Sequence, residues 1–166
     1  MVSRETYRDG MARMAAAVNV ITTQGPAGPG GFTASAVCSL TDDPATLLVC
    51  VNLSSRQSEI LRGNGVLCVN TLAADQAPIA AMFSTRDVTM EARFALGGWS
   101  TLATGSPVLE GAVVSFDCRI VERLERGTHA VILCEALAVQ LGHGEAALVY
   151  FDRHFRSMTG GDQGSR

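Results

Sequence analysis

The chain has 166 residues, of which 47% are hydrophobic and 17% charged, and its formal net charge at pH 7 is -3. This length fits one domain with a sizeable core, and the low charged fraction favours an obligate oligomer that buries further surface. The slightly negative balance, with no basic run, argues against nucleic acid or an anionic membrane as the principal partner.

The amino-terminal segment predicts a short amphipathic helix followed by a strand. Tyr7, Met11 and Met14 recur at near-helical spacing within residues 4–18, and Ser3 is a suitable cap. Residues 18–23 are β-branched and strand-like. The segment lacks the basic start and apolar run of a signal peptide, and no apolar stretch of the sequence reaches membrane-spanning length. We therefore expect a soluble, cytoplasmic protein.

A glycine-rich turn at residues 25–31 leads into a strand-length run with small side chains, Gly31 to Leu40. The turn resembles a dinucleotide-binding glycine loop, but prolines lie inside it and a strand follows instead of a helix, which excludes a Rossmann site. Small side chains allow a flat ligand to approach the backbone, whose N–H and C=O groups can then read its polar edge.

A near-continuous apolar strand, residues 46–53, follows a turn at 42–44 and leads into a helix from Ser55. Ser54 and Gln57 fit a capping box at its start, and a helix N-terminus beside hydroxyls and Arg56 is suited to binding phosphate. A flat ring next to a phosphate suggests a flavin nucleotide. From residue types alone, a core hairpin with a capped helix after it is the simpler interpretation.

The remaining elements favour an antiparallel β-barrel. We expect a strand at 66–72, a helix at 75–83, an irregular stretch at 84–106 that carries Trp99, and a strand alternating with period two from 112 to 121. Its partner is 129–141, and a turn at 142–145 precedes a strand at 147–151. Six or seven strands joined mostly by short turns are typical of such a barrel. The domain should span 1–158 and a disordered tail 159–166.

The five cysteines lie inside apolar, strand-like runs and include no Cys-x-x-Cys pair. They are typical of reduced core residues in a cytosolic protein and not of a disulfide framework or zinc site, so we expect no metal. The residues are Cys38, Cys50, Cys68, Cys118 and Cys134.

An ordered set of motifs resembles the short-chain flavin reductases, the NAD(P)H:flavin oxidoreductase components of two-component monooxygenases. The resemblance runs from about Tyr7 to Phe155. Its motifs are Gly31-Phe32-Thr33-Ala34-Ser35, Val51-Asn52-Leu53-Ser54-Ser55, Val66 to Asn70, Met82-Phe83-Ser84-Thr85-Arg86, Pro107 to Ala112, Gly127-Thr128-His129 and Val149 to Phe155.

The resemblance implies a mainly β fold, a six-stranded antiparallel Greek-key split barrel of the FMN-binding type, with a few short helices. It also implies a homodimer that uses NADH or NADPH to reduce FMN or FAD and passes the reduced flavin to a monooxygenase. Two alternatives remain open at this stage: a flavin-binding or carrier protein without reductase turnover, and an oxidase of the related pyridoxamine-phosphate type.

The resemblance also assigns roles to individual residues, and because hydride transfer between stacked rings needs binding and orientation only, no side chain is assigned as catalytic. His129 would contact the nicotinamide, and Arg153 and Phe155, with Tyr150 and His154, would cover the ligands. Thr128 replaces the usual aspartate, and Ala92-Arg93-Phe94 lies about three residues further from Phe83 than in the family pattern. The flavin-binding set is Thr33, Ala34, Ser35 and Ala36 for the ring and ribityl chain, Asn52, Ser54, Ser55, Arg56 and Ser58 for the ribityl hydroxyls and phosphate, and Phe83, Ser84 and Arg86.

Overall fold

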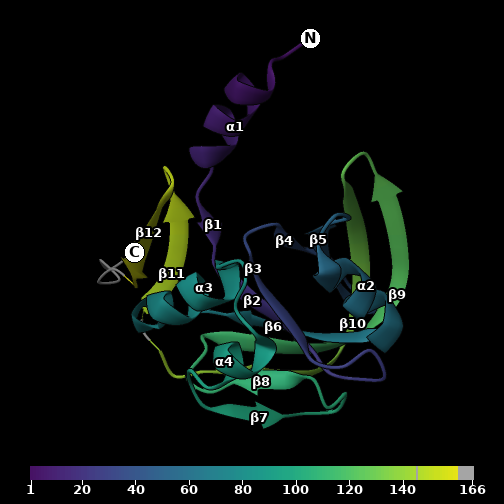
Figure 1. The fold of residues 1–166 in the computed structure, drawn as a ribbon. Helices are drawn as coiled ribbons and strands as arrows, with labels where there is room; N and C mark the ends of the chain where they lie inside the picture. The colour runs from purple at the N-terminus through teal and green to yellow at the C-terminus, as the bar shows by residue number, and fades with distance from the viewer. Residues whose placement is uncertain (145, 161–166) are drawn as a thin grey trace.

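In a computed structural model, residues 1–144 and 146–160 are described, and strands predominate (Figure 1). The elements, in chain order, are α1 (Arg4–Ala12), β1 (Ala16–Ala17), β2 (Asn19–Thr23), β3 (Gly30–Ala34), β4 (Val37–Asp42), β5 (Ala45–Asn52), α2 (Arg56–Asn64), β6 (Val66–Thr71), the 3-10 turn η1 (Ala74–Gln76), α3 (Ala77–Ser84), α4 (Met90–Phe94), β7 (Trp99–Thr101), β8 (Pro107–Leu109), β9 (Val114–Arg126), β10 (His129–Leu141), β11 (Ala146–Phe151) and β12 (His154–Thr159).

The main sheet is antiparallel and curls into a split barrel. Its strand order is β3-β2-β6-β9-β10-β5-β4, so β3 and β4 form its two edges. These edge strands are consecutive in the chain and are joined only by Ser35 and Ala36. Because two residues cannot span an open seven-stranded sheet, the sheet must close on itself at this seam. The mainly β split-barrel prediction is confirmed, and counting β3 and β4 as one bent strand gives the expected six.

The barrel interior is filled by side chains from β2, β9 and their neighbours in the sheet. Ser115, Asp117 and Cys118 of β9 are buried, and β2 is buried along its whole length. The barrel core is completed by apolar side chains from strands on all sides, among them Ile21, Val49, Leu67, Ile132 and Cys134. A second core cluster includes Leu72, Phe83 and Leu109 and lies beneath α3.

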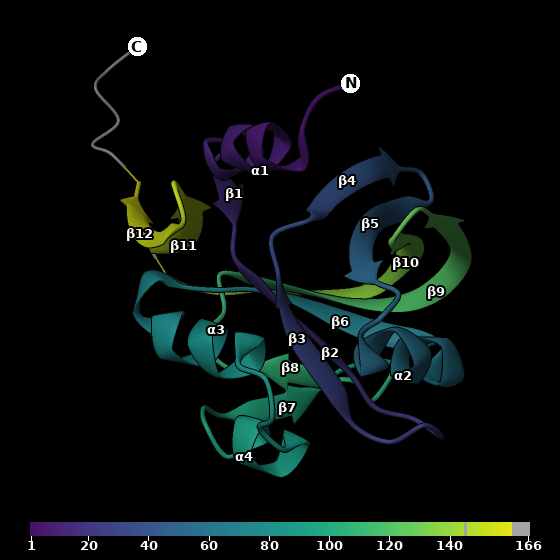
Figure 2. The same ribbon diagram turned by 45° about the horizontal axis from the view of Figure 1, so that its top comes forward.

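Helices α2 and α3 lie on either side of β3 (Figure 2). Ser55 caps α2 by accepting from the N–H of Gln57, and Gly65 ends it in the left-handed conformation with φ 68°. The predicted capping box is wrong in its residues, because Ser55 and not Ser54 is the cap. Pro78 lies in the first turn of α3, as predicted.

Residues 84–106 are more regular than expected. They contain α4 and β7, and the ring of Trp99 packs against Phe83 and Phe94 at centroid distances of 5.6 and 5.0 Å. The aromatic packing fixes a segment whose sequence has no clear period. A β7–β8 hairpin lies under this cluster.

The chain ends also differ from expectation. Helix α1 ends at Ala12 instead of reaching Val18, and β12 runs to Thr159, one residue into the expected tail. Residues 161–166 of that tail lie outside the described residues. No helix in the described part of the chain is long and apolar enough to span a membrane.

Candidate functional site

The seam of the barrel exposes the small-residue stretch predicted to line a flat ligand. Ser35 and Ala36 are exposed, Thr33 is half-buried and Ala34 is buried. The Thr33 hydroxyl donates to the carbonyl oxygen of Ala80 at 2.7 Å, which ties β3 to α3. The strand thus presents backbone and small side chains to solvent at the seam.

Gly31 is the point at which α2 and α3 meet on β3. Its N–H donates to Oε1 of Gln57, in the first turn of α2, at 2.9 Å. A Cβ at this position would lie 2.6 Å from Cε1 of Phe83, near the end of α3. Only glycine leaves room for both helices, so the start of α2 and the end of α3 converge beside the seam.

The start of α2 presents polar groups to solvent. Oδ1 of Asn52 accepts from both the N–H and the hydroxyl of Ser54, at 2.9 and 2.8 Å, and Ser54 and Arg56 are exposed. Ser58, predicted to hold a phosphate, is instead fully buried, and its hydroxyl accepts from Nη2 of Arg123 at 2.9 Å. Ser58 therefore joins α2 to β9 on the buried side of the helix.

The residues predicted at the end of α3 also include both buried and exposed side chains. Phe83 is 1% exposed and belongs to the aromatic core, so its side chain supports the site without facing it. Ser84, the last residue of α3, and Arg86, on the loop that follows, are exposed. The N-terminal end of the α2 dipole favours an anion near the exposed hydroxyls at the start of that helix.

His129, at the start of β10, lies directly opposite Asn52 of β5. The carbonyl oxygen of Thr128 accepts from the N–H of Leu53 at 3.0 Å, which fixes the β9–β10 turn against the start of α2. The Thr128 hydroxyl lies 2.9 Å from Nδ1 of His129. Threonine therefore provides a hydrogen bond to the imidazole where the resemblance expected an aspartate to provide it.

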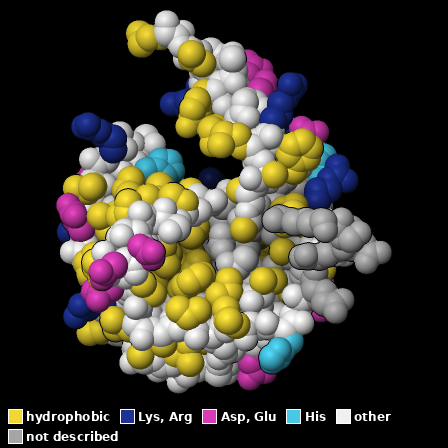
Figure 3. Space-filling view, turned by 180° about the vertical axis from the view of Figure 1, so that it is seen from behind, with side chains coloured by type: hydrophobic (Ala, Val, Ile, Leu, Met, Phe, Trp, Pro, Cys, Tyr) yellow, Lys and Arg dark blue, Asp and Glu magenta, His cyan; other side chains and the backbone are white. Residues whose placement is uncertain are grey.

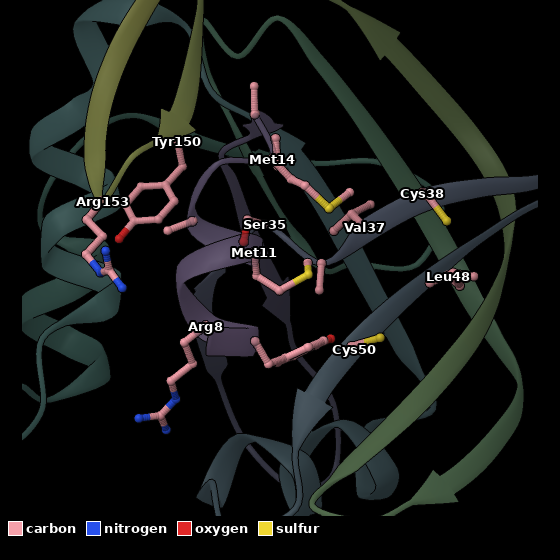
Figure 4. A pocket seen from close by; sticks show the side chains of 15 residues that line it. Arg8, Met11, Met14, Ser35, Val37, Cys38, Leu48, Cys50, Tyr150 and Arg153 are labelled. Carbon is pink, nitrogen blue, oxygen red and sulfur yellow. The ribbon is translucent and has the colours of Figure 1, made fainter. Parts of the chain in front are cut away.

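A second part of the site is a cleft of ≈ 730 Å³ between α1, the β4–β5 hairpin and β11 (Figure 4). Met11 of α1 and Met14, two residues beyond its end, lie on the side of Val37, and Ser35 and Ala36 also line the cleft. Arg153 lines the cleft and forms an ion pair with Asp9, which raises the pKa of its guanidinium.

The structure therefore groups the predicted residues in two places. Phe155 packs on Tyr150 with ring centroids 5.9 Å apart, beside Arg153. The β11–β12 hairpin that carries them and the β9–β10 turn that carries His129 lie on opposite sides of the molecule (Figure 1). The three predicted nicotinamide contacts are not brought together within one chain, whereas His129 is brought to Asn52 and α2.

Sequence reasoning missed two residues that shape this site, Gln57 and Arg93. Gln57 was assigned only to the cap, but its side chain crosses to Gly31. Arg93 was noted only for its altered spacing, although it is 8% exposed and bonds to the loop after α3. A charged residue predicted in an irregular segment gives no sign of burial, so only the fold could reveal it.

Three comparisons place this arrangement among known proteins. The family model of the flavin reductase like domain matches residues 11–159. The "FMN reductase (NADH) RutF" of Ancylobacter novellus is 53% identical over 163 residues, covering 98% of this chain and 90% of that protein.

Solved structures have the same fold. BorF, the flavin reductase component of a bacterial two-component tryptophan halogenase, superimposes with a TM-score of 0.89 at 29% identity, over 95% of this chain and 99% of that one. The NADH:FAD oxidoreductase SgcE6 of Streptomyces globisporus C-1027, in complex with NAD and FAD fragments, gives a TM-score of 0.88 at 25% identity, over 97% and 95% of the two chains.

Proposed function

The chain belongs to the family of flavin reductase like domains, and we propose that it is an NADH-dependent flavin reductase that supplies reduced flavin to a partner monooxygenase. It is an oxidoreductase: one hydride passes from C4 of the nicotinamide to N5 of the flavin, and a solvent proton completes the dihydroflavin. The observation that carries this function is the convergence of the barrel seam and the start of α2, with His129 beside them.

The residues at the seam fit a flavin nucleotide. Thr33, Ala34, Ser35 and Ala36 line the ring and ribityl chain, where their small side chains leave room for a flat ligand. Asn52, Ser54, Ser55 and Arg56 hold the ribityl hydroxyls and phosphate from one side, and Ser84 and Arg86 from the other. Ser58 and Phe83 are buried and support the site through packing.

The nicotinamide contact is His129, held by Thr128. A hydrogen bond of 2.9 Å to the threonine hydroxyl limits the rotation of the imidazole, so the ring can present its other nitrogen to the dinucleotide. This contact favours the reductase over a flavin carrier, because the Thr128 hydroxyl can orient the His129 ring as the aspartate of the family pattern would. NADH is the expected donor since it is named for the relatives at about half identity.

The active form is a homodimer. Large apolar side chains are exposed on β4, β9 and β10, and hydrophobic residues gather on the rear face (Figure 3). A second copy would cover this face and the cleft beside α1, and could bring an Arg153 and Phe155 toward the His129 of the other chain. The exposed large apolar side chains of these three strands are Leu40, Val121, Leu124, Leu137, Val139 and Leu141. The five cysteines are free, which agrees with a place in the cytoplasm.

Light scattering during gel filtration tests the dimer. A mass of two chains that persists on dilution supports it, and a single-chain mass at all concentrations contradicts it. The change that tests the apolar surface is Leu137→Glu, at an exposed leucine of β10, and the control is Thr101→Glu, at an exposed residue of β7, which lies outside the main sheet. Only the first should shift the mass toward one chain.

Steady-state turnover tests the function itself. Purified protein is mixed with NADH or NADPH and with FMN, FAD or no flavin, and loss of the nicotinamide absorbance is followed. Flavin-dependent oxidation of NADH supports the reductase. Flavin that stays bound through gel filtration, with no nicotinamide oxidation, supports the carrier and contradicts the proposal.

A further inference from the structure

A buried arginine closes the end of α3 beneath the predicted phosphate loop. The guanidinium of Arg93 donates through Nη1 to the carbonyl oxygen of Phe83 and through Nη2 to that of Thr85, both at 2.6 Å. Its Nε donates to the carbonyl oxygen of Val88 at 3.3 Å. One side chain from α4 therefore holds both ends of the loop formed by residues 84–88.

Its charge has no acidic partner. Among the ion pairs of the described residues none includes Arg93, although the side chain is 8% exposed. Its neighbours are carbonyl oxygens and the ring of Phe83, whose centroid is 5.9 Å from the guanidinium carbon. Burial lowers the pKa of Arg93 from its usual value, which reflects the cost of this charge. A nearby anion would offset that cost.

The position of the loop explains why a positive charge there would favour an anion. Ser84 is the last residue of α3, and the C-terminal end of a helix carries partial negative charge on its free carbonyl groups. These groups would repel a phosphate beside Ser84 and Arg86. Arg93 donates hydrogen bonds to the carbonyl oxygens of Phe83 and Thr85 and so offsets their partial negative charge.

The arginine also connects the two halves of the junction. Gly31 lies between Gln57 of α2 and Phe83 of α3, and Phe83 carries both the ring and the carbonyl group that contact Arg93. Loss of the guanidinium would free the loop of Ser84 and Arg86, whereas β3 would lose one long hydrogen bond, from Nη1 to the carbonyl oxygen of Gly31 at 3.5 Å, and keep its ladder to β2. Its effect should fall on the phosphate end of the ligand and not on the ring.

We propose that Arg93 is a positioning residue that makes flavin binding depend on the phosphate group, by holding the carboxyl end of α3 and offsetting the negative charge of its carbonyl groups. The inference rests on the proposed function, since it places the flavin phosphate between α2 and this loop. It predicts a protein that prefers FMN to riboflavin because of a residue that the ligand does not need to touch.

Binding of FMN and of riboflavin by Arg93→Met and Arg93→Lys tests it, measured by flavin fluorescence in the absence of nicotinamide. Arg93→Met should weaken FMN binding about tenfold or more and change riboflavin binding less than about twofold, because only FMN carries the charge. Arg93→Lys keeps the charge but not the bridging geometry, so it should weaken FMN binding by less than Arg93→Met does. The control is Arg62→Met, an exposed arginine paired with Glu59.

The outcomes separate this inference from the function on which it rests. Equal losses of affinity for FMN and for riboflavin in Arg93→Met would overturn it. If the methionine variant does not fold, the same result in Arg93→Lys would do so. A lysine variant that binds FMN as tightly as the wild type would also overturn it. In the wild type, inorganic phosphate should compete with FMN and not with riboflavin. A wild-type protein that binds neither flavin would overturn the proposed function as well.

Discussion

Gly31→Ala tests whether the close approach of the two helices at the barrel seam shapes the site. The new Cβ would lie 2.6 Å from Cε1 and 3.0 Å from Cδ1 of Phe83. Carbon atoms in contact are ordinarily 3.5–4.0 Å apart, so the ring or the end of α3 must move by about 1 Å. Phe83 is 1% exposed and packed between Phe94 and Trp99, which prevents the ring from rotating away.

The expected loss in the free energy of unfolding is about 1–3 kcal/mol, the usual cost of overpacking a core. FMN binding should weaken too, because α3 carries Ser84 and its loop. Urea denaturation and flavin fluorescence measure the two effects. Gly10→Ala in α1 is the control, since its Cβ meets nothing within 4 Å. In a Phe83→Leu background the cost of Gly31→Ala should fall, and an undiminished cost, or an unchanged stability in the single variant, would refute the steric reasoning.

Four further experiments test other parts of the structure. Ser58→Ala should lower the free energy of unfolding by about 1.5–3 kcal/mol, because the Arg123 guanidinium loses a hydrogen-bond acceptor. It should leave the ratio of FMN to riboflavin affinity unchanged. An altered ratio would show that Ser58 contacts the ligand. His129→Ala should raise the KM for NADH about two- to tenfold and leave flavin affinity nearly unchanged, and an unaltered KM would remove the residue from the site. Iodoacetamide should label Cys38 before Cys50, because burial and the neighbouring Cys38 thiol raise the pKa of Cys50; peptide mass spectrometry showing the reverse order would contradict this. Burial also raises the pKa of the Cys68 thiol above the ordinary value of 9.0, so above about pH 9 the thiol ionises in the unfolded chain and not in the folded one. The free energy of unfolding should therefore fall above about pH 9. It should fall less steeply in Cys68→Ala.

The sequence patterns predicted the barrel well because strand signals are local. Period-two alternation identified β9, and the β-branched and small-residue runs identified β2 and β3. The bend at Ser35 and Ala36, which makes one predicted strand into two, comes from closure of the sheet and has no local signal. Helix α1 stopped short of its hydrophobic pattern because Ala16 pairs with β11, a contact distant in sequence.

The site was predicted in its residue types more than in its contacts. Ser54 and Ser55 could be located from their position before a helix, but which of them caps it depends on the Asn52 side chain, which engages Ser54. Ser58 gave the same signal as its neighbours, and its burial against Arg123 depends on a strand 65 residues away. Arg93 gave none, because the burial of a charge is decided by tertiary packing.

Anaerobic titration of the protein and FMN with NADH tests the central claim most directly. Each NADH consumed should bleach one oxidised flavin, since a single hydride carries both electrons. Added oxygen should restore the flavin absorbance without restoring NADH. Unchanged nicotinamide and flavin spectra with FMN and with FAD, under conditions in which the flavin is bound, would contradict it.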